Sequence, residues 1–390
     1  MTTLTPLEIA SGLVLGTTPP TPPPSATVGA REALELAVRP ALERAPCLVS
    51  FSGGRDSSAV LAVATHVARR DGLPLPIPAT NVFPSVELSD EAEWQEHVVA
   101  HLGLDEWLRL EHNNELDCVG PVATDLLSRH GLLWPFNAHF HAPLLGHAAG
   151  GSLLTGVGGD ELLLITNRSR WNELLRGRAR PEARDALRLG FALAPRPMRR
   201  WARARQLPLD FTWLRPDARR RFVREWANER VVQPRRWSEL VDWVRRLRYV
   251  SVGTASLATI AAGEGAEIAH PFLDPAFGAA IAALPRGRRF ETRTQAMTEL
   301  FGDLLPKELL ERRTKASFDG AFWNEPSRAF ARGWDGSGID DDVVDGAALR
   351  AEWSKDSPDP RTYTLAQSVW LRTQQGSRDG FEQPVERVAG

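Results

Sequence analysis

The sequence has few cysteines and no long apolar run. Its 390 residues include only two cysteines, Cys47 and Cys118, which are too few for a disulfide framework and lack metal-ligand spacing. We therefore expect buried free thiols in a reducing cytoplasm. No apolar run approaches the roughly 20 residues of a membrane span, and the first residues lack the positive charges of a secretory signal. We expect no membrane partner.

Lysine is scarce, although Lys and Arg together number 47. Arginine therefore supplies nearly all of the positive charge, and each lysine is a candidate for chemistry that needs a compact ammonium group. The three lysines are Lys307, Lys315 and Lys355. The formal net charge is only -2, so the overall charge does not indicate a class of partner.

The length allows one large domain or two ordinary ones. Residues 1–27 are expected to form an N-terminal extension that ends in the proline-rich linker "TTPPTPPPS". The compact domain is expected over residues 28–375, with a helical, basic segment at 168–250. Residues 376–390 are polar and are expected to be a disordered tail.

Strand-like and helix-like patterns alternate in the first 165 residues. The sequence predicts strands at residues 47–51, 77–83 and 106–111 and near 151–154, each followed by an amphipathic helical stretch. Alternation of this kind favours an α/β fold, with a doubly wound parallel sheet and helices on both faces. We expect the C-terminal half to be helical: residues 168–250 show no convincing strand, and residues 251 to about 334 are expected to be helical with loops.

A glycine turn, "SGGRDSS" at residues 52–58, follows the first predicted strand. Ligands of parallel sheets bind beyond the carboxyl ends of the strands, where helix N-termini favour anions. Gly53 and Gly54 let the backbone approach a phosphate, and Asp56 can hold a magnesium ion. Three hydroxyl groups can donate to phosphate oxygens: Ser52, Ser57 and Ser58. This stretch predicts a polyphosphate site.

The turn is not the lysine-containing P-loop, because G-x-x-x-x-G-K-[ST] does not occur and no lysine precedes Lys307. It does not match G-x-G-x-x-G either, which disfavours a dinucleotide fold. The alternative is a plain strand-to-helix connection with Gly-Gly and a capping Asp. However, S-G-G-x-D-S is expected by chance only about once in a thousand chains of this size.

The S-G-G-x-D-S motif after a strand is the PP-loop of the ATP pyrophosphatases. From about residue 30 to 330, the chain resembles the synthetase domain of class B asparagine synthetases and their relatives, the β-lactam synthetases and lasso peptide cyclases. The resemblance implies ATP and Mg²⁺ as cofactors. It also implies cleavage of ATP between the α and β phosphates, adenylation of a carboxylate and displacement of AMP by an amine.

Two further stretches carry the resemblance. "TGVGGDELL" at residues 155–163 is similar to the family's S-G-E-G-x-D-E, which makes Asp160 the second magnesium ligand and places Gly156 against the nucleotide. "AEIAHPFLD" at residues 266–274 is similar to E-A-R-V-P-F-L-D.

A fourth landmark, "RRTKASFDG" at residues 312–320, is similar to the family's R-x-K-x-x-F-S-D-G loop. The resemblance places Lys315 where an essential lysine contacts the α-phosphate and the developing pyrophosphate. A compact ammonium group in a chain that otherwise uses arginine fits that role. The alternative for Lys315 is a solvated surface side chain.

The chain also departs from the family. Position 157 is Val, where asparagine synthetases have Glu and β-lactam synthetases have Tyr, so the base that deprotonates the amine is not visible. Glu161 is a candidate base, and His139 or His141 is a candidate for contacting the substrate. Position 55 is Arg, where asparagine synthetases usually have Leu.

The family's glutamine-hydrolysing domain begins with a catalytic Cys after Met1, whereas this sequence begins Met-Thr-Thr. We therefore expect an amine that is not produced by a glutaminase of the same chain.

Arginine and tryptophan crowd the basic segment. Residues 196–248 contain sixteen arginines and six acidic residues, a difference of +10. Amphipathic helices that bury Trp explain this composition, and a surface for a peptide or carrier-protein partner at residues 196–250 is an alternative. We expect no nucleic-acid partner, because the pI near 6.5 is well below the value of about 9 typical of nucleic-acid-binding domains.

These observations together predict a cytoplasmic, ATP-dependent, AMP-forming carbon–nitrogen ligase. We expect either a macrocyclase or an amide ligase of a specialised metabolic pathway, acting on a small molecule or a peptide. Two alternatives stay open: a tRNA-modifying PP-loop enzyme and a nucleotide-binding pseudoenzyme that serves as a scaffold. No motif identifies the acid, the amine or the oligomeric state.

Overall fold

The computed structural model contains a five-stranded sheet in which all neighbouring strands are parallel. The strand order is β3-β2-β1-β4-β5, as a doubly wound fold requires. The strands are β1 (Cys47–Ser50), β2 (Ile77–Val82), β3 (Leu108–Glu111), β4 (Ser152–Leu154) and β5 (Glu267–Ala269). The structure describes residues 3–20, 25–86, 89–163, 180, 182, 191, 194–207, 210–234, 236–285, 289–290, 292–312 and 318–379. The predicted α/β fold with a helical C-terminal half is confirmed.

Residues 251 to about 334 were expected to be helical with loops, and the structure adds a short strand there, because β5 pairs with β4 at the edge of the sheet. Its three residues are too few to show the period-two alternation that identifies a strand in a sequence. Only the pairing with β4 defines it.

Side chains of β1 alternate between the two faces of the sheet. Cys47 and Val49 pack on one face, while Leu48 packs on the other. The first face is covered by α2 (Ala30–Leu42), α3 (Arg55–Asp71) and α4 (Ala92–Leu102). The second is covered by α5 (Pro121–His130), α6 (Ala142–His147) and α13 (Arg248–Gly263). The nearly continuous apolar run of β1 is explained by burial on both sides.

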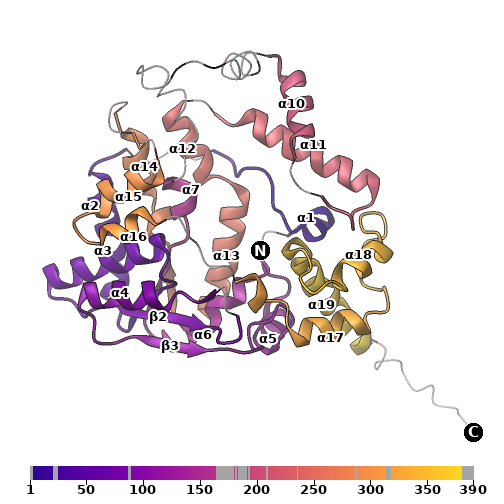
Figure 1. Ribbon diagram of the computed structural model, residues 1–390, viewed down its shortest axis with the longest axis horizontal. Helices are drawn as coiled ribbons and strands as arrows, with labels where there is room; N and C mark the ends of the chain where they lie inside the picture. Colours follow the sequence, from indigo (N-terminus) through magenta and orange to yellow (C-terminus); the bar gives the residue numbers. More distant parts are fainter. Residues whose placement is uncertain are drawn as a thin grey trace, which may run out of the picture.

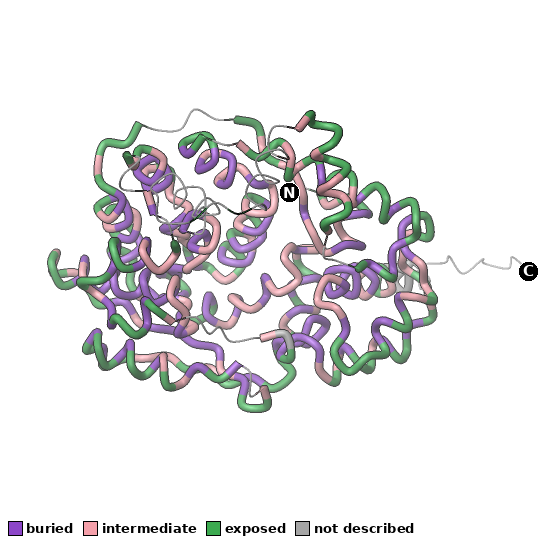
Figure 2. The backbone as a smooth tube through the Cα atoms, turned by 45° about the horizontal axis from the view of Figure 1, so that its top comes forward, coloured by how far each residue is buried: buried purple, intermediate pink, exposed green. Residues whose placement is uncertain are grey.

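A second, all-helical body lies beside the sheet, with its own buried cluster of side chains. In Figure 1 its helices are drawn in orange and yellow, with α1 (Pro6–Ser11) next to them. They are α17 (Glu325–Gly333), α18 (Gly346–Trp353) and α19 (Tyr363–Asp379). Figure 2 shows buried segments in both bodies.

Helix α1 belongs to the predicted N-terminal extension, and it packs against the helical body. Leu7 and Ala10 of α1 are buried in the cluster of the helical body, at 3% and 1% exposure. The sequence did not predict this contact, because a six-residue helix before a proline-rich linker has no pattern that indicates packing against a distant part of the chain. The limits of the compact domain at residues 28 and 375 stay a prediction.

The basic segment contains three described helices: α10 (Arg196–Arg205), α11 (Pro216–Val232) and α12 (Trp237–Arg245). Trp213, Trp237 and Trp243 are buried, as amphipathic helices predict. In contrast, α10 has no buried residue, and its Met198 and Trp201 are 61% and 62% exposed. Much of residues 168–193 lies outside the described part of the chain. The peptide or carrier-protein surface stays a prediction.

The remaining helices surround the carboxyl edge of the sheet. They are α7 (Gly159–Leu163), α14 (Pro275–Ala283), α15 (Arg293–Phe301) and α16 (Lys307–Glu311). Short 3-10 helices occur at Ala138–His141, Pro271–Leu273, Asp319–Ala321 and Pro360–Thr362. None of the described helices has the length and hydropathy needed to cross a membrane. Both cysteines are buried and unpaired, and burial raises the pKa of Cys47 to about 11.

Candidate active site

The glycine turn connects β1 directly to the N-terminus of α3. Gly53 has φ +78°, a left-handed conformation that favours glycine, and a Cβ atom there would lie 2.9 Å from Cγ of Gln95. The N-cap residue of α3 is Gly54, which has no side chain to bond to the first amide groups. These N–H groups therefore have no capping side chain and provide an anion site.

Ser52 and Ser57 hold the turn closed. The hydroxyl oxygens of the two residues lie 3.1 Å apart, and the Ser57 hydroxyl accepts a hydrogen bond from the backbone N–H of Ser52 at 3.2 Å. The Ser52 hydroxyl also accepts from the N–H of Gly54 at 3.3 Å. This network orients both hydroxyls at the mouth of the helix.

A cavity of about 530 Å³ opens at this edge of the sheet. Its size lies in the range of about 300–1,000 Å³ typical of small-molecule sites. The candidate residues that line it are Ser52, Gly54, Asp56, Ser57, Gly156 and His141. Five other candidates do not line it: Gly53, Ser58, His139, Asp160 and Glu161. The sequence analysis therefore identified one wall of the cavity.

The two predicted magnesium ligands lie on either side of one guanidinium group. Arg293, the first residue of α15, places Nη2 2.5 Å from Oδ2 of Asp56 and Nη1 2.5 Å from Oδ1 of Asp160. The side chains of Arg293 and Asp56 are 16% and 17% exposed, so this pair is largely removed from water. Residues far apart in the sequence thus form one charged centre.

Two glycines allow this close approach between the turns. A Cβ atom at Gly159 would lie 2.4 Å from Cγ of Asp56, and one at Gly156 would lie 2.9 Å from the backbone nitrogen of Ser57. Any larger residue at either position would push the second glycine turn away from the first. The resemblance predicted Gly156 at the nucleotide, and the structure adds a close contact with the end of α3.

The charged centre fits a magnesium ion held partly by protein and partly by phosphate. Both carboxylates pair with the guanidinium of Arg293, so both are close enough to contact a single magnesium ion. Within the described residues, no group of three or more His, Cys, Asp or Glu side chains is placed to hold a metal. Mg²⁺ is commonly bound through one or two carboxylates plus substrate phosphates and water, so Asp56 and Asp160 form a suitable ligand set.

Three arginines line the same cavity: Arg55, Arg293 and Arg312. The guanidinium of Arg312 forms a bidentate ion pair with Glu91, and both side chains are buried, at 7% and 5% exposure. Arg55 and Arg293 lie close enough for repulsion to lower the pKa of Arg55, although burial of Arg55 is the larger cause. A cavity with several cations on its wall favours a polyanionic ligand.

Sequence reasoning missed Arg293, because no motif includes it and only folding brings α15 to the glycine turns. Arg312 belongs to the stretch that resembles the lysine loop, but we assigned it no role. Lys315 lies outside the described residues, so its role at the phosphates stays a prediction.

The two candidate histidines have different surroundings. His139 is buried at 3% exposure, with its ring nitrogens 3.0 Å and 2.9 Å from the carbonyl oxygens of Phe136 and Leu116. That position is structural. His141 lines the cavity, and its Nδ1 is buried without a hydrogen-bond partner among the described residues. Burial, together with the nearby His270, lowers the pKa of His141 to about 4.

Glu161 accepts a hydrogen bond from the hydroxyl of Tyr249 at 3.1 Å. Burial and this carboxylate raise the pKa of Tyr249 above its usual range. Val157, in contrast, places an apolar side chain in the wall of the cavity. Glu161 and Tyr249 therefore form an acid–hydroxyl pair beside the second glycine turn.

Comparison with known proteins agrees with this arrangement. The family model for asparagine synthase matches residues 29–374, which is most of the 390-residue chain. A search of the curated proteins finds no match. The chain therefore belongs to the asparagine synthase family and is, in general terms, an ATP-dependent, amide-forming ligase.

Proposed function

We propose that this protein activates a carboxylate by adenylation and transfers the acyl group to an amine. A carboxylate oxygen attacks the α-phosphorus of ATP, and pyrophosphate leaves with the electrons of the broken P–O bond. The amine nitrogen then attacks the acyl carbon, AMP leaves, and the proton of the amine passes to a base. The observation that carries the proposal is the pairing of Arg293 with both Asp56 and Asp160 at the N-terminus of α3, beside the cavity that Asp56 and Arg293 line.

The protein's own groups account for the binding of the phosphates. The hydroxyls of Ser52 and Ser57 and the amide groups at the start of α3 donate to phosphate oxygens. Asp56 and Asp160 would hold a magnesium ion, and the guanidinium of Arg293 lies between these two carboxylates. When bound, the metal neutralises charge on the leaving pyrophosphate. We propose that Lys315 adds an ammonium group at the α-phosphate.

The second half-reaction needs a base for the incoming amine. We propose Glu161, because it is a carboxylate one residue from Asp160 and is held by Tyr249. The pKa of His141, lowered to about 4, makes that side chain a weak base at neutral pH. His141 is better suited to contact a substrate as a neutral imidazole.

The role in metabolism is also part of the proposal. We propose a macrocyclase or an amide ligase of a specialised pathway, since Val157 replaces the side chains with which relatives handle their amine. The source of the amine is tested by supplying glutamine or free ammonia to the purified protein with ATP. We expect ammonia or another amine to support AMP formation, and glutamine not to do so.

The proposal is tested by binding of ATP with and without Mg²⁺ to the wild type and to the Asp56→Asn and Asp160→Asn variants. We expect Mg²⁺ to tighten ATP binding to the wild type and to have little effect on either variant. Release of pyrophosphate with a panel of carboxylates should fall about 100-fold or more in both. The matched control is Asp71→Asn at the far end of the same helix α3, where Asp71 pairs with Arg39 and Arg70 and does not line the cavity.

Three results would speak against this function. Equal enhancement by Mg²⁺ in the wild type and both variants would contradict the assignment of the two carboxylates. Binding of ATP without turnover for every carboxylate would favour a scaffold. Tight RNA binding that weakens steeply with salt would favour a tRNA enzyme.

A further inference from the structure

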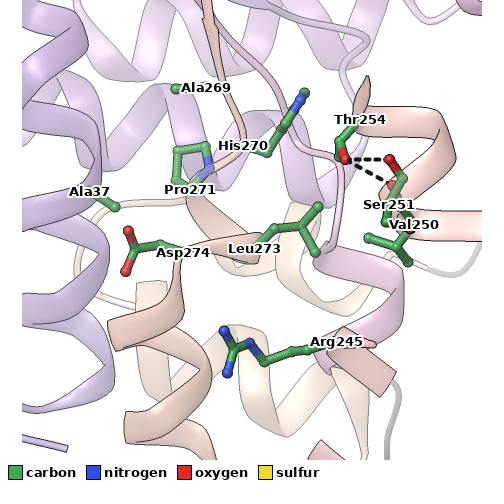
Figure 3. A pocket seen from close by; sticks show the side chains of 10 residues that line it. All are labelled: Ala37, Arg245, Val250, Ser251, Thr254, Ala269, His270, Pro271, Leu273 and Asp274. Carbon is green, nitrogen blue, oxygen red and sulfur yellow. Dashed lines mark hydrogen bonds between the residues drawn. The ribbon is translucent and has the colours of Figure 1, made fainter. Parts of the chain in front are cut away.

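A second cavity, of about 360 Å³, lies next to the nucleotide cavity. Figure 3 shows its lining side chains, most of which come from α12, from α13 and from the segment that joins β5 to α14, with Ala37 of α2 and Ala269 of β5 completing the wall. It also falls within the size range of small-molecule sites. No part of the proposed adenylation chemistry uses this cavity.

The most polar feature of this wall is Arg245, the last residue of α12. Its side chain lies across α14 at Gly278, where a Cβ atom would be 2.4 Å from Cδ and 2.6 Å from Nε of Arg245. Glycine inside a helix is less stable than alanine. The glycine at this position therefore makes room for the arginine at some cost to the helix.

Among the described residues, Arg245 has no anionic partner. Its Nε is buried and has no hydrogen-bond partner, and no ion pair of its guanidinium is found in the described part of the chain. A cation that is partly removed from water without a partner is unfavourable. Guanidinium groups bind carboxylates through paired hydrogen bonds, so an anionic ligand would compensate for this cost.

The rest of the wall suits the organic part of a small ligand. Val250, Pro271 and Leu273 contribute apolar surface. The hydroxyls of Ser251 and Thr254 donate to helix carbonyl groups, as the dashed lines for Thr254 in Figure 3 show. These hydroxyl oxygens are left as acceptors.

Asp274 is the one carboxylate in the lining of this cavity. Its Oδ1 accepts hydrogen bonds from the N–H groups of Ala276 and Phe277 and caps α14. It forms no ion pair with Arg245 among the interactions of the described residues. An amine beside the ligand's carboxylate would therefore meet Asp274 rather than Arg245.

The second cavity is coupled to the nucleotide site through a short chain of contacts. Oγ1 of Thr155, which lines the nucleotide cavity, lies 2.7 Å from Nδ1 of His270, which lines the second. Thr155 Oγ1 also accepts from the N–H of Val157 at 3.3 Å. A Cβ atom at Gly158 would lie 2.5 Å from Leu273, so the turn that leads to Asp160 packs against the wall of the second cavity.

We propose that this second cavity binds a small organic carboxylate, with the carboxylate group on the guanidinium of Arg245. The site stands independently of the adenylation reaction, because it depends only on Arg245, Gly278 and the shape of the cavity. A carboxylate bound there is separated from the nucleotide cavity by the contact between Thr155 and His270.

The test measures binding of acetate, pentanoate, phenylacetate and L-norvaline by calorimetry, with pentanamide as the uncharged comparison. We expect at least one carboxylate to bind the wild type, and to bind it more tightly than pentanamide does. The same carboxylate should bind Arg245→Met at least tenfold more weakly. Arg236→Met is the matched control, since Arg236 precedes α12 and its side chain is 83% exposed. It should bind like the wild type.

A second variant separates binding from folding. Gly278→Ala adds a single methyl group that displaces the flexible end of Arg245, so we expect weaker carboxylate binding and an unchanged or higher melting temperature. The comparison of pentanoate with L-norvaline shows whether an amine at Asp274 adds affinity.

The proposal is overturned if no carboxylate binds the wild type, if pentanamide binds as tightly, or if Arg245→Met binds equally well. Asp56→Asn should leave carboxylate binding unchanged. Failure of the adenylation proposal is therefore distinguishable from failure of this one. Pyrophosphate release with each bound carboxylate distinguishes a substrate from a ligand that is not consumed.

Discussion

Arg55 occupies the first position of α3, directly before Asp56. Its Nη1 lies 3.4 Å from both the hydroxyl of Thr294 and the carbonyl oxygen of Leu310, so the side chain reaches from α3 to α15 and α16. It lines the nucleotide cavity, and burial and the charge of Arg293 lower its pKa. Cations that repel one another around a cavity are stabilised when a polyanion binds between them.

We therefore predict that Arg55→Leu, which restores the residue usual in asparagine synthetases, weakens binding of ATP and pyrophosphate about tenfold. This loss corresponds to about 1.4 kcal/mol, near the lower end for a hydrogen bond to a charged group. Binding of AMP should change little. Calorimetric titration with the three ligands measures the difference.

Arg70→Leu is the control for Arg55→Leu, since Arg70 lies near the other end of α3 and its side chain is 46% exposed. Equal losses for AMP and ATP in Arg55→Leu would contradict a role at the outer phosphates.

Helix α1 shows how a short element gains stability from its neighbours. Its six residues begin with a capping box between Thr5 and Glu8. The indole N–H of Trp213 donates to the carbonyl oxygen of Ala10 at 2.7 Å, and Glu8 also forms an ion pair with Arg248. Isolated helices of this length are unstable in water, so the helix depends on this tertiary packing.

We predict that Leu7→Ala lowers the free energy of unfolding by about 2–4 kcal/mol, because Leu7 is 3% exposed and its removal leaves a cavity. Urea unfolding measured by circular dichroism tests this value. Leu36→Ala makes the same chemical change in α2, where Leu36 is 54% exposed. The control should cost less than about 0.5 kcal/mol. A similar small cost for Leu7→Ala would show that α1 is not part of the stable core.

The stability of the whole molecule should depend on pH through His141 and His270, which are partly buried. Burial lowers the pKa of His141 and of His270 to about 4, compared with about 6.5 in an unfolded chain. Between these values the unfolded chain binds more protons than the folded one. Stability is therefore complete above pH 6.5 and is lost as the pH falls toward 4, by up to about 1.4 kcal/mol per pH unit for each histidine.

Replacing both histidines, as His141→Gln with His270→Gln, should flatten the pH dependence of unfolding between pH 6.5 and 4.5. Chemical denaturation at several pH values measures the slope for the wild type and for the double variant. His147→Gln is the control, since His147 is exposed at the end of α6. An unchanged slope in the double variant would mean that neither histidine is held neutral by the fold.

Local patterns in the sequence were sufficient for the first four strands and for the glycine turns, because buried strands and tight turns have strong short-range signals. The family resemblance then predicted that Asp160 and Gly156 lie at the same site as the first glycine turn. The three residues of β5 and the six of α1 lacked such signals. Both are stable only through pairing or packing with residues distant in the sequence.

The sequence by itself determined the α/β class. It also predicted that the glycine turn binds phosphate and, through the family resemblance, that Asp56 and Asp160 are magnesium ligands. Only the tertiary structure placed Arg293 between Asp56 and Asp160 and laid Arg245 across Gly278 beside the second cavity. The physical reason is that burial and pairing of a charge depend on which elements pack together. Neither arginine belongs to a local sequence pattern. Folding places two carboxylates beside Arg293, and it leaves Arg245 without an ion pair among the described residues.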